Sequence, residues 1–588
     1  HPLNLNSGPD GSHCLGPDAC LHALAQGQLD AHQALLQAEC QLEQAQADPL
    51  WALPACMALW KLERYQEAYE LHRSYQHHFH NNADAWVIAG MCARRLPQHQ
   101  GDAEHAFQAA LRLNPDRADT HYNLGNLYND ANRHAEAVTA YQSSLALDPN
   151  GALVWHNLGI ALRELEQLDG ADQAMRTSVR LDPFNPDAWC NLGLVAHARQ
   201  AFELSKRFYL HSIQLDGGHA SSWTNLGMSL LEEVKPEEAL PALRRGHSLN
   251  PRSPDALFNY ALTLLLLGDY EEGWRLYESR FTTKQFKDTV VPSSGPWLTQ
   301  LEQLQELKAS GQRCLIWSEQ GIGDAIQFVR YLPILQALEI PFAFATRPAL
   351  VPLFQQWGPA GITVLDDTQL EPPWSEAPHL AQLSLPRLLR SDLLTIPMVT
   401  PYLTPPGPPP ERLLVPPPPG GIAIGLVWAS NPGNKAMYRQ KSLPLDLLLP
   451  ALLPALQHNL IELHSLQVGK DALQLTPYSH IEGVHDWNGK LNDFGDTAHV
   501  VHQLDLLISV DTAVAHLAGA LAIPTWLILP SNADFRWLHQ RSDSPWYDTM
   551  RLFRQTKPNH WPSAIAQVVD ALGEVLGLDL AQLPEHDH

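Results

Sequence analysis

The first half of the chain repeats with a period of 34 residues, and this period constrains the fold more than any other feature. The repeat begins, at this spacing, at His121, Trp155, Trp189, Trp223 and Leu257. A small residue follows four positions after each start, at Gly125, Gly159, Gly193, Gly227 and Ala261. A small side chain lets two helices approach closely. Three of these units end in Pro149, Pro183 and Pro251, and proline ends a helix because it lacks an N–H and disfavours helical backbone in the preceding residue.

Weaker copies extend the array toward the N-terminus. One unit runs from Trp86 to Pro115, an earlier one fits residues 52–80, and the alanine-rich residues 18–49 have the character of a cap. A period of 34 residues is typical of tetratricopeptide repeats, in which each unit is a helical hairpin. We therefore expect a solenoid over residues 18–282, with about seven or eight hairpins and a concave surface suited to peptide or protein. Residues 1–17 are expected to be disordered.

Composition excludes several classes of protein. The net charge is −24 and basic residues form no cluster, so nucleic acid is not an expected partner, because neutralising phosphates requires clustered Lys and Arg. The seven cysteines include no Cys-x-x-Cys pair, and no run of eighteen apolar residues predicts a membrane span. The start of the chain lacks the charged and apolar segments of a signal peptide. These observations predict a cytoplasmic protein.

The second half alternates short apolar runs with helical segments, which predicts α/β structure with parallel sheets. After an irregular linker, residues 283–311, we expect a first Rossmann-like unit over residues 312–404. It is predicted to contain strands at 312–318, 341–346 and 362–365 and a helix at 325–338. A proline-rich connector, residues 405–420, precedes a second unit over residues 421–580. There we expect strands at 422–428, 460–464, 506–510 and 525–529, and helices at 442–456, 513–521 and 562–576.

The strongest chemical signal lies where a strand of the second unit meets a helix. Asp511 ends the strand, Thr512 is placed to cap the helix, and Ala513 opens a first turn of small residues. A helix N-terminus with free N–H groups and no bulky side chain can bind an anion. His516, in the same turn, would add a donor toward phosphate or sugar. The alternative is an ordinary strand–turn–helix with a capping threonine.

Two further segments follow strands. Residues 431–441 carry Lys435, Arg439 and Lys441 in a predicted loop, where three cations would complement a diphosphate; the alternative is a solvated basic loop. In the first unit, Gly321 and Gly323 permit the close approach of a substrate. Asp324 beside them is either a general base or a helix cap.

These segments together resemble a known family. Residues 319–333, 425–442 and 505–546 resemble bacterial tetratricopeptide proteins with a C-terminal glycosyltransferase-B domain. That domain is related to heptosyltransferases and, more distantly, to O-linked N-acetylglucosamine transferases. The most specific motif is residues 510–520, VDTAVAHLAGA, followed by residues 534–538 and 543–547.

The resemblance implies roles for individual residues. Asp324 would be the catalytic base, in an acceptor-side loop with Gln320, Gly321 and Gly323. The donor phosphates and sugar would be held by Asn431, Arg439, Lys441, Ser442, Asp511, Thr512, Ala513 and His516. Lys441 and His516 would also act in catalysis.

The expected reaction is an inverting transfer of a sugar from a nucleotide-diphospho-sugar to an acceptor hydroxyl. The acceptor would be a protein or peptide held by the solenoid. Neither a metal nor a cofactor is expected, since helix N–H groups and cations would offset the charge of the diphosphate. The first unit is short for an acceptor domain, so we expect the last repeats to complete its wall. The alternative is a non-catalytic repeat scaffold for protein–protein interaction with a degenerate transferase domain.

Overall fold

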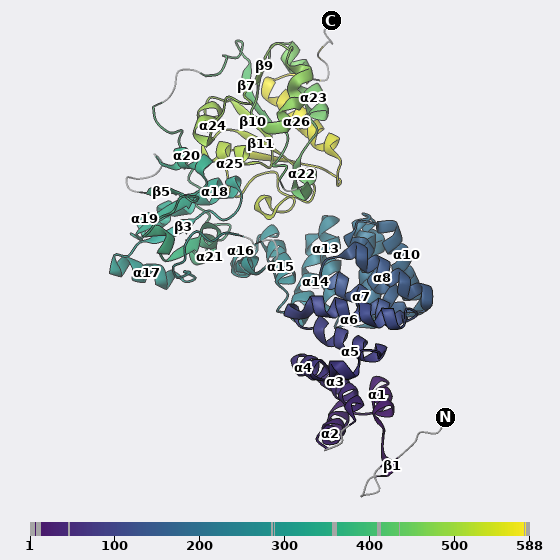
Figure 1. The fold of residues 1–588 in the computed structure, drawn as a ribbon. Coiled ribbons are helices and arrows are strands. Elements are labelled where there is room, and N and C mark those ends of the chain that lie inside the picture. The colour runs from purple at the N-terminus through teal and green to yellow at the C-terminus, as the bar shows by residue number, and fades with distance from the viewer. Residues whose placement is uncertain are drawn as a thin grey trace. The chain divides into compact units, whose positions relative to one another are not determined.

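The computed structural model describes residues 6–7, 13–44, 48–283, 286, 289–355, 362–408, 413–433, 435–580 and 583. The chain divides into two compact units, residues 1–222 and 223–588. The first unit contains repeat hairpins, and the second combines the last repeats with the α/β half (Figure 1). Of the expected disordered stretch, residues 1–5 and 8–12 lie outside the described residues, whereas β1 (Asn6–Ser7) and β2 (His13–Cys14) pair antiparallel.

The first unit is an array of helical hairpins, as the 34-residue period predicts. Its helices are α1 (Pro17–Ala25), α2 (Ala31–Leu42), α3 (Ala52–Lys61), α4 (Tyr65–Tyr75), α5 (Ala83–Arg94), α6 (Gln100–Leu113), α7 (Ala118–Asp130), α8 (His134–Leu147), α9 (Ala152–Glu164), α10 (Leu168–Leu181), α11 (Pro186–Ala198) and α12 (Phe202–Leu215). The repeated tryptophan and proline are directly linked. Trp155 Nε1 donates to the Pro149 carbonyl at 2.9 Å, and Trp189 Nε1 donates to that of Pro183 at 2.8 Å.

The small residue of each repeat is needed because the second helix of its hairpin lies against it. A Cβ on Gly193 would lie 2.4 Å from a ring carbon of Tyr209. At Gly159 the nearest neighbour, at 2.8 Å, is the flexible side chain of Met175. The glycines therefore set how closely the helices pack, and the tolerance of each position depends on its neighbour.

The second unit begins with repeat helices and continues into two sheets. The repeat helices are α13 (Ala220–Glu232), whose first turn contains the unit boundary, α14 (Pro236–Leu249), α15 (Pro254–Leu266) and α16 (Tyr270–Tyr277). A four-stranded parallel sheet has the order β5-β4-β3-β6. Its strands are β3 (Cys314–Trp317), β4 (Phe342–Thr346), β5 (Thr363–Asp366) and β6 (His379–Ala381).

A six-stranded sheet follows in the second half of this unit. Its strands are β7 (Ile422–Val427), β8 (Ile461–Ser465), β9 (Val484–Asp486), β10 (Leu506–Val510), β11 (Thr525–Leu529) and β12 (Met550–Arg554). They are parallel in the order β12-β11-β10-β7-β8-β9. The chain thus starts in the middle, runs to one edge, and returns to build the other half, which is the doubly wound order of nucleotide-binding sheets.

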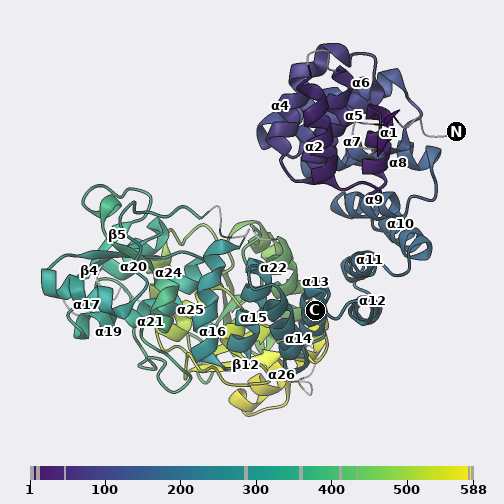
Figure 2. The ribbon, with the colours of Figure 1, turned by 90° about the horizontal axis from the view of Figure 1, so that it is seen from below.

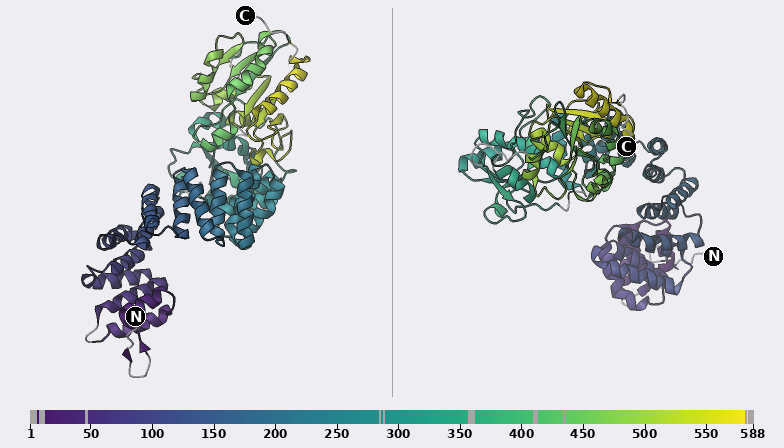
Figure 3. Two further views of the ribbon diagram at one scale, coloured as in Figure 1. Left: turned by 90° about the vertical axis from the view of Figure 1, so that its right-hand side faces the viewer. Right: turned by 90° about the horizontal axis from the view of Figure 1, so that it is seen from above.

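Helices cover both faces of the six-stranded sheet. Helices α23 (Leu445–Gln457) and α26 (Trp561–Leu576) share one apolar core with its strands. Helices α24 (Phe494–Val501) and α25 (Ala513–Ala520) lie on the opposite face, where α25 contacts β10 and β11. Figure 3 shows the green and yellow strands between their flanking helices. A parallel sheet covered on both faces accounts for the nearly continuous apolar runs of its strands.

Several segments differ from the sequence-based expectations. The helix expected at 325–338 is divided into α18 (Ile322–Phe328), a 3-10 turn and α19 (Leu332–Ala337). Pro333 lies in the first turn of the second piece, and its missing N–H interrupts the hydrogen-bond ladder. Helix α17 (Leu301–Ser310) lies within the expected linker, with Gln300 and Gln303 forming a capping box. The remaining short helices are α20 (Val351–Gln355), α21 (Leu385–Leu388) and α22 (Lys435–Lys441).

The last repeat hairpin is packed into the α/β half. The Trp274 ring centroid lies 5.8 Å from that of Phe328 in α18 and 5.8 Å from that of Phe535, which follows β11. The fully buried Arg280 pairs with Glu319, next to β3, at 2.7 Å. Figure 2 shows α15 and α16 beside the helices of the sheets. The last repeats therefore form part of the wall around the sheets, as expected from the short sheet unit predicted at residues 312–404.

Candidate functional site

A cavity of about 340 Å³ opens where the six-stranded sheet meets the last repeats. Its apolar side comes from α13 and α15 and includes Met228, Leu231, Leu262 and Leu266. Its polar side comes from the carboxyl ends of β10, β11 and β12 and from α22, and includes Gln440, Lys441, Asp511, Asn532, Asp534 and Arg554. Doubly wound sheets bind ligands at this edge, beside the point where the strand order reverses. That point is the junction of β7 and β10.

Lys441 and Asp511 form an ion pair at this junction. Lys441 Nζ lies 2.5 Å from Asp511 Oδ2, and both side chains are largely buried. Burial by itself would lower the pKa of Lys441, but the charges of Asp511 and Asp534 outweigh it and raise that pKa. Burial would likewise raise the pKa of Asp511, but Lys441 and then His516 hold it well below its usual range. Both groups are therefore ionised at neutral pH.

The start of α25 offers free backbone donors beside this pair. Thr512 is the N-cap residue, but its side chain makes no capping hydrogen bond. Its Oγ1 lies 3.0 Å from Ser509 Oγ instead, so the predicted threonine cap is wrong. Within the described part of the chain, the N–H groups of Ala513 and Val514 have no hydrogen-bond acceptor. Such N–H groups at a helix start attract an anion.

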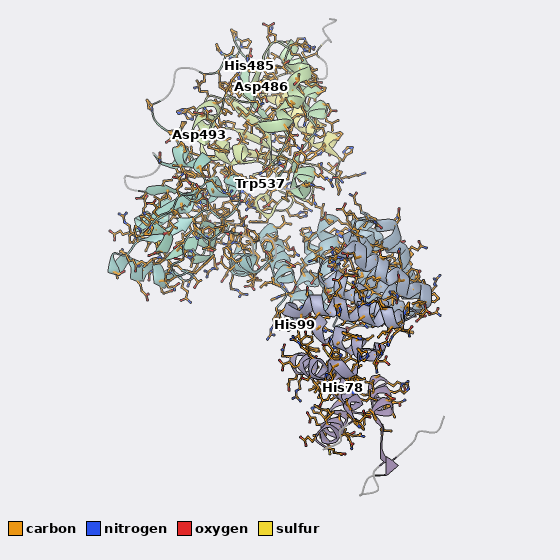
Figure 4. The ribbon with its side chains drawn as sticks, in the orientation of Figure 1. His78, His99, His485, Asp486, Asp493 and Trp537 are labelled. Atoms are coloured by element: carbon orange, nitrogen blue, oxygen red, sulfur yellow. The ribbon has the colours of Figure 1, made fainter. Side chains whose placement is uncertain are left out.

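His516 is enclosed by protein groups. Its Nδ1 lies 2.9 Å from the Tyr547 hydroxyl, its Nε2 lies 3.7 Å from Asp511 Oδ1, and its ring stacks on Trp537 with centroids 5.2 Å apart. Figure 4 labels Trp537 at the end of the sheet unit that faces the last repeats. His516 therefore orients Asp511 and Tyr547. The structure places it behind the ion pair, with 4% of its surface exposed.

The loop of the first sheet unit packs against this histidine. A Cβ on Gly323 would lie 2.8 Å from His516 Cδ2. The glycine therefore lets α18 approach α25, whereas the sequence had suggested the approach of a substrate. Gln320, in the same loop, donates from Nε2 to the Tyr277 hydroxyl at 2.8 Å, which ties the loop to the last repeat.

Asp324 caps the start of α18, which is one of the two roles predicted for it, and it also forms an ion pair. Its Oδ2 accepts a hydrogen bond from the Gly321 N–H at 3.0 Å, and its Oδ1 pairs with Arg536. Arg536 also pairs with Asp534 at 2.7 Å. Burial lowers the pKa of Arg536, but Asp324 and Asp534 outweigh it and raise that pKa. A carboxylate with both oxygens engaged in this way is poorly placed to accept a proton.

The predicted cationic loop is a helix, and its cations are not brought together. Residues 435–441 form α22, in which positions two apart point to different sides. Lys441 faces the cavity, whereas Arg439 is exposed. The Asn431 side chain is also exposed and accepts a hydrogen bond from the Gly433 N–H at 2.9 Å. Ser442 Oγ accepts from the Ser430 N–H at 3.0 Å, which fixes the start of the segment that leads to α22.

Four residues of the site were not assigned from the sequence. Asp534 and Arg536 lie within the motif at 534–538, where the residue types offered a signal. Asn532, in the loop after β11, and Glu232, at the end of α13, come together at the cavity, with 3.2 Å between Asn532 Nδ2 and Glu232 Oε2. No local pattern relates two positions 300 residues apart.

The described residues hold no cluster of three or more His, Cys, Asp or Glu side chains that would suit a metal ion. Among the helices in the described part of the chain, none has the length and apolar character required to cross a membrane.

Comparisons with known proteins identify the repeats. Tetratricopeptide-repeat models match residues 101–152 and 224–279, and a second such model matches residues 140–173. The chain is 29% identical over 357 residues to protein FlbA of Caulobacter vibrioides, which covers 55% of this chain. The chain spans about half, 56%, of the length of that relative.

Solved structures of repeat proteins are similar at a lower level. Pseudomonas aeruginosa PilF matches with a TM-score of 0.31 and 16% identity, covering 36% of this chain and 93% of its own. YrrB, described as a repeat protein with an unusual peptide-binding site, matches with a TM-score of 0.26 and 22% identity, covering 31% of this chain and 94% of its own. The fold is established by the repeats and strands themselves: this chain contains tetratricopeptide repeats joined to an α/β half with two parallel sheets.

Proposed function

We propose that the compact unit of residues 223–588, which contains both parallel sheets, is a glycosyltransferase of the glycosyltransferase-B fold. It would transfer a sugar, with inversion, from a nucleotide-diphospho-sugar to a hydroxyl of a protein or peptide. The observation that carries the proposal is the junction of β7 and β10, where free N–H groups of α25 and the buried Lys441 meet beside a cavity. Two parallel sheets whose helices α18 and α25 pack together support the same assignment.

The donor diphosphate would lie at the start of α25. The N–H groups of Ala513 and Val514 would donate to its oxygens, and Lys441 would supply positive charge next to them. Asp511 keeps Lys441 in place at 2.5 Å and ionised. This arrangement offsets the charge of the diphosphate with protein groups alone, so the proposed reaction needs no metal.

The reaction forms one bond and breaks another at the anomeric carbon. The acceptor oxygen loses its proton to a base and bonds to that carbon from the face opposite the diphosphate. The bond between the carbon and the phosphate oxygen breaks, and its electron pair leaves with the nucleotide diphosphate. Fixed donors and charge that are aimed at the leaving group stabilise the transition state. The repeats would hold the acceptor, because concave repeat surfaces bind peptide and protein.

A protein-binding scaffold without catalysis is the second candidate. The observation that favours it is the match of the repeat models to residues 101–173 and 224–279. Both candidates share binding of a protein through the repeats, and they differ in whether the cavity takes a nucleotide sugar.

One experiment separates them. The full chain is incubated with UDP-, GDP- and ADP-sugars, thermal stabilisation is measured, and acceptors in a cell extract are then analysed by mass spectrometry for an added sugar. We expect one nucleotide class to stabilise the protein and one sugar mass to appear on acceptors. The variant Lys441→Met/Asp511→Asn should lose both signals, whereas Arg439→Met, on the exposed side of α22, should retain them. If no nucleotide sugar stabilises the protein and no acceptor gains mass, the scaffold is the correct assignment.

A further inference from the structure

Three carboxylates line the cavity, and they differ in their partners. Asp511 pairs with Lys441, and Asp534 pairs with Arg536. Glu232, the last residue of α13, has no cationic side chain within ion-pair distance among the residues that the structure describes. A carboxylate held by a cation is a weak proton acceptor, because the cation stabilises the ionised form. Glu232 is therefore the cavity carboxylate best suited to accept a proton.

Glu232 faces the candidate donor site from the repeat side. Its Oε2 accepts a hydrogen bond from Asn532 Nδ2 at 3.2 Å. The backbone carbonyl of Asn532 accepts a hydrogen bond from Gln440 Nε2 at 2.9 Å, and Gln440 precedes Lys441 in α22. This chain of contacts links the glutamate to the cationic side of the cavity.

The other charged and titratable groups that line this cavity are Lys441, Asp511, Asp534, His539 and Arg554. His539 Nε2 lies 3.8 Å from Glu237, and Arg554 donates to the carbonyls of Trp537 and Leu538. Burial raises the pKa of Glu232, and the hydrogen bond from Asn532 offsets only part of that rise. A raised pKa brings a carboxylate nearer to the pH at which a general base is most effective.

We propose that Glu232 is the general base of the transfer, so that a repeat helix supplies a catalytic residue. This inference rests on the proposed function. The Glu232 carboxylate would take the proton of the acceptor hydroxyl as its oxygen bonds to the anomeric carbon, and the nucleotide diphosphate would leave with the electron pair of the broken bond. The acceptor would reach the glutamate along α13 and α15, where Met228, Leu231 and Leu262 form an apolar wall.

The placement also explains why Asp324 is not needed as a base. Asp324 does not line the cavity, and its oxygens are engaged by Gly321 and Arg536. In this arrangement the donor is held by the six-stranded sheet, and the base lies on the opposite side of the cavity, on the element that would carry the acceptor.

The test compares Glu232→Gln with Glu238→Gln in the full chain. Glutamine retains the size of the side chain and can still accept the hydrogen bond from Asn532. We expect Glu232→Gln to lower kcat by about 10²–10⁴-fold, the usual contribution of a general base, while stabilisation by the donor nucleotide is unchanged. Glu238 is exposed on α14, and its variant should transfer at the wild-type rate. Transfer by Glu232→Gln within a factor of three of wild type would overturn the inference and leave the proposed function standing.

The pH profile provides an independent measurement. Transfer by the wild type should fall at acidic pH as Glu232 becomes protonated. Asn532→Ala removes the hydrogen bond that stabilises the ionised carboxylate, so this loss should begin at a higher pH. An acid limb at the same pH in both proteins contradicts the inference, even if Glu232→Gln fails to fold. Absence of transfer by the wild type with every donor would instead refute the proposed function and, with it, the role of Glu232.

Discussion

Replacing only one partner of the Lys441–Asp511 ion pair should destabilise the unit of residues 223–588 far more than replacing both partners. In Lys441→Met the buried Asp511 carboxylate would retain only His516, whose Nε2 lies 3.7 Å away. Removing one partner of a buried ion pair costs about 3–5 kcal/mol, whereas replacing both partners by neutral groups is often close to neutral. Lys441→Met/Asp511→Asn should therefore recover most of the stability that the single variant loses.

The pH dependence of this effect follows from the direction of the pKa shift. The folded-state pKa of Asp511 lies below the ordinary value of 3.8. The stabilisation by the pair is thus fully present above that value and is lost as the pH falls through the folded-state pKa. The wild type should therefore lose this stabilisation in acid, whereas Lys441→Met/Asp511→Asn, which lacks both charged groups, should not show the loss.

The assay is thermal unfolding of the full chain together with hydrogen exchange of peptides from β10, which report on the second unit. With about 2.1 cal/mol/K of unfolding entropy per residue, about 1 kcal/mol moves the midpoint of a unit as long as residues 223–588 by roughly 1.3 °C. Lys441→Met should therefore lower the midpoint by roughly 4–7 °C. The refuting result is additivity: if the double variant is as unstable as the two single variants together, within about 0.5 kcal/mol, the two side chains do not form the pair described.

Three other predictions concern packing and protonation. Gly323→Ala places a Cβ against His516 and should cost about 1–3 kcal/mol, measured by urea unfolding. Gly193→Ala, whose Cβ meets a tyrosine ring, should destabilise the repeats more than Gly159→Ala, whose Cβ meets a flexible methionine. Equal losses of hydrogen-exchange protection in the two variants would contradict this ranking. Burial, and then a neighbouring histidine, lower the pKa of His464 to about 4, so stability should fall by at most about 3 kcal/mol as the pH drops from 6.5 to 4, and His464→Gln should flatten that dependence in urea titrations.

The repeats were predictable because each hairpin uses the same local contacts. The proline that ends one unit accepts a hydrogen bond from the tryptophan that begins the next, six positions later, as in the Trp155–Pro149 pair. The glycine meets the second helix of its own hairpin. Contacts of short range leave a periodic trace in the sequence. A single sequence therefore sufficed to predict the helical hairpins.

The sheets were predictable only in part. Strands such as β10 and β11 are buried on both faces and appear as continuous apolar runs. β9 has only three residues, Val484–Asp486, and the outer strand β12 carries Arg551 and Arg554. At the edges of a sheet, exposure permits polar residues, so the apolar pattern that marks a strand is lost.

The arrangement of the proposed ligand-binding residues could be established only from the folded structure. The sequence placed Asp511, Ala513 and Lys441 near the end of a strand, and the structure brings them together. It could not show that the cationic segment is a helix that turns Arg439 outward. The orientation of a side chain on a short helix is set by what packs on it, and here that is the junction of β7 and β10.

The role of the last repeats was the hardest feature to predict from the sequence, because it arises from contacts between segments that are distant in the chain. Trp274 contacts aromatic rings of both sheet units, and Glu232 meets Asn532 across 300 positions. A boundary drawn where the repeat pattern stops would remove the apolar wall of the cavity together with Glu232. The repeat pattern identifies which helices share a hairpin, whereas the packing identifies which helices share a site, and the two divisions of this chain fall at different residues.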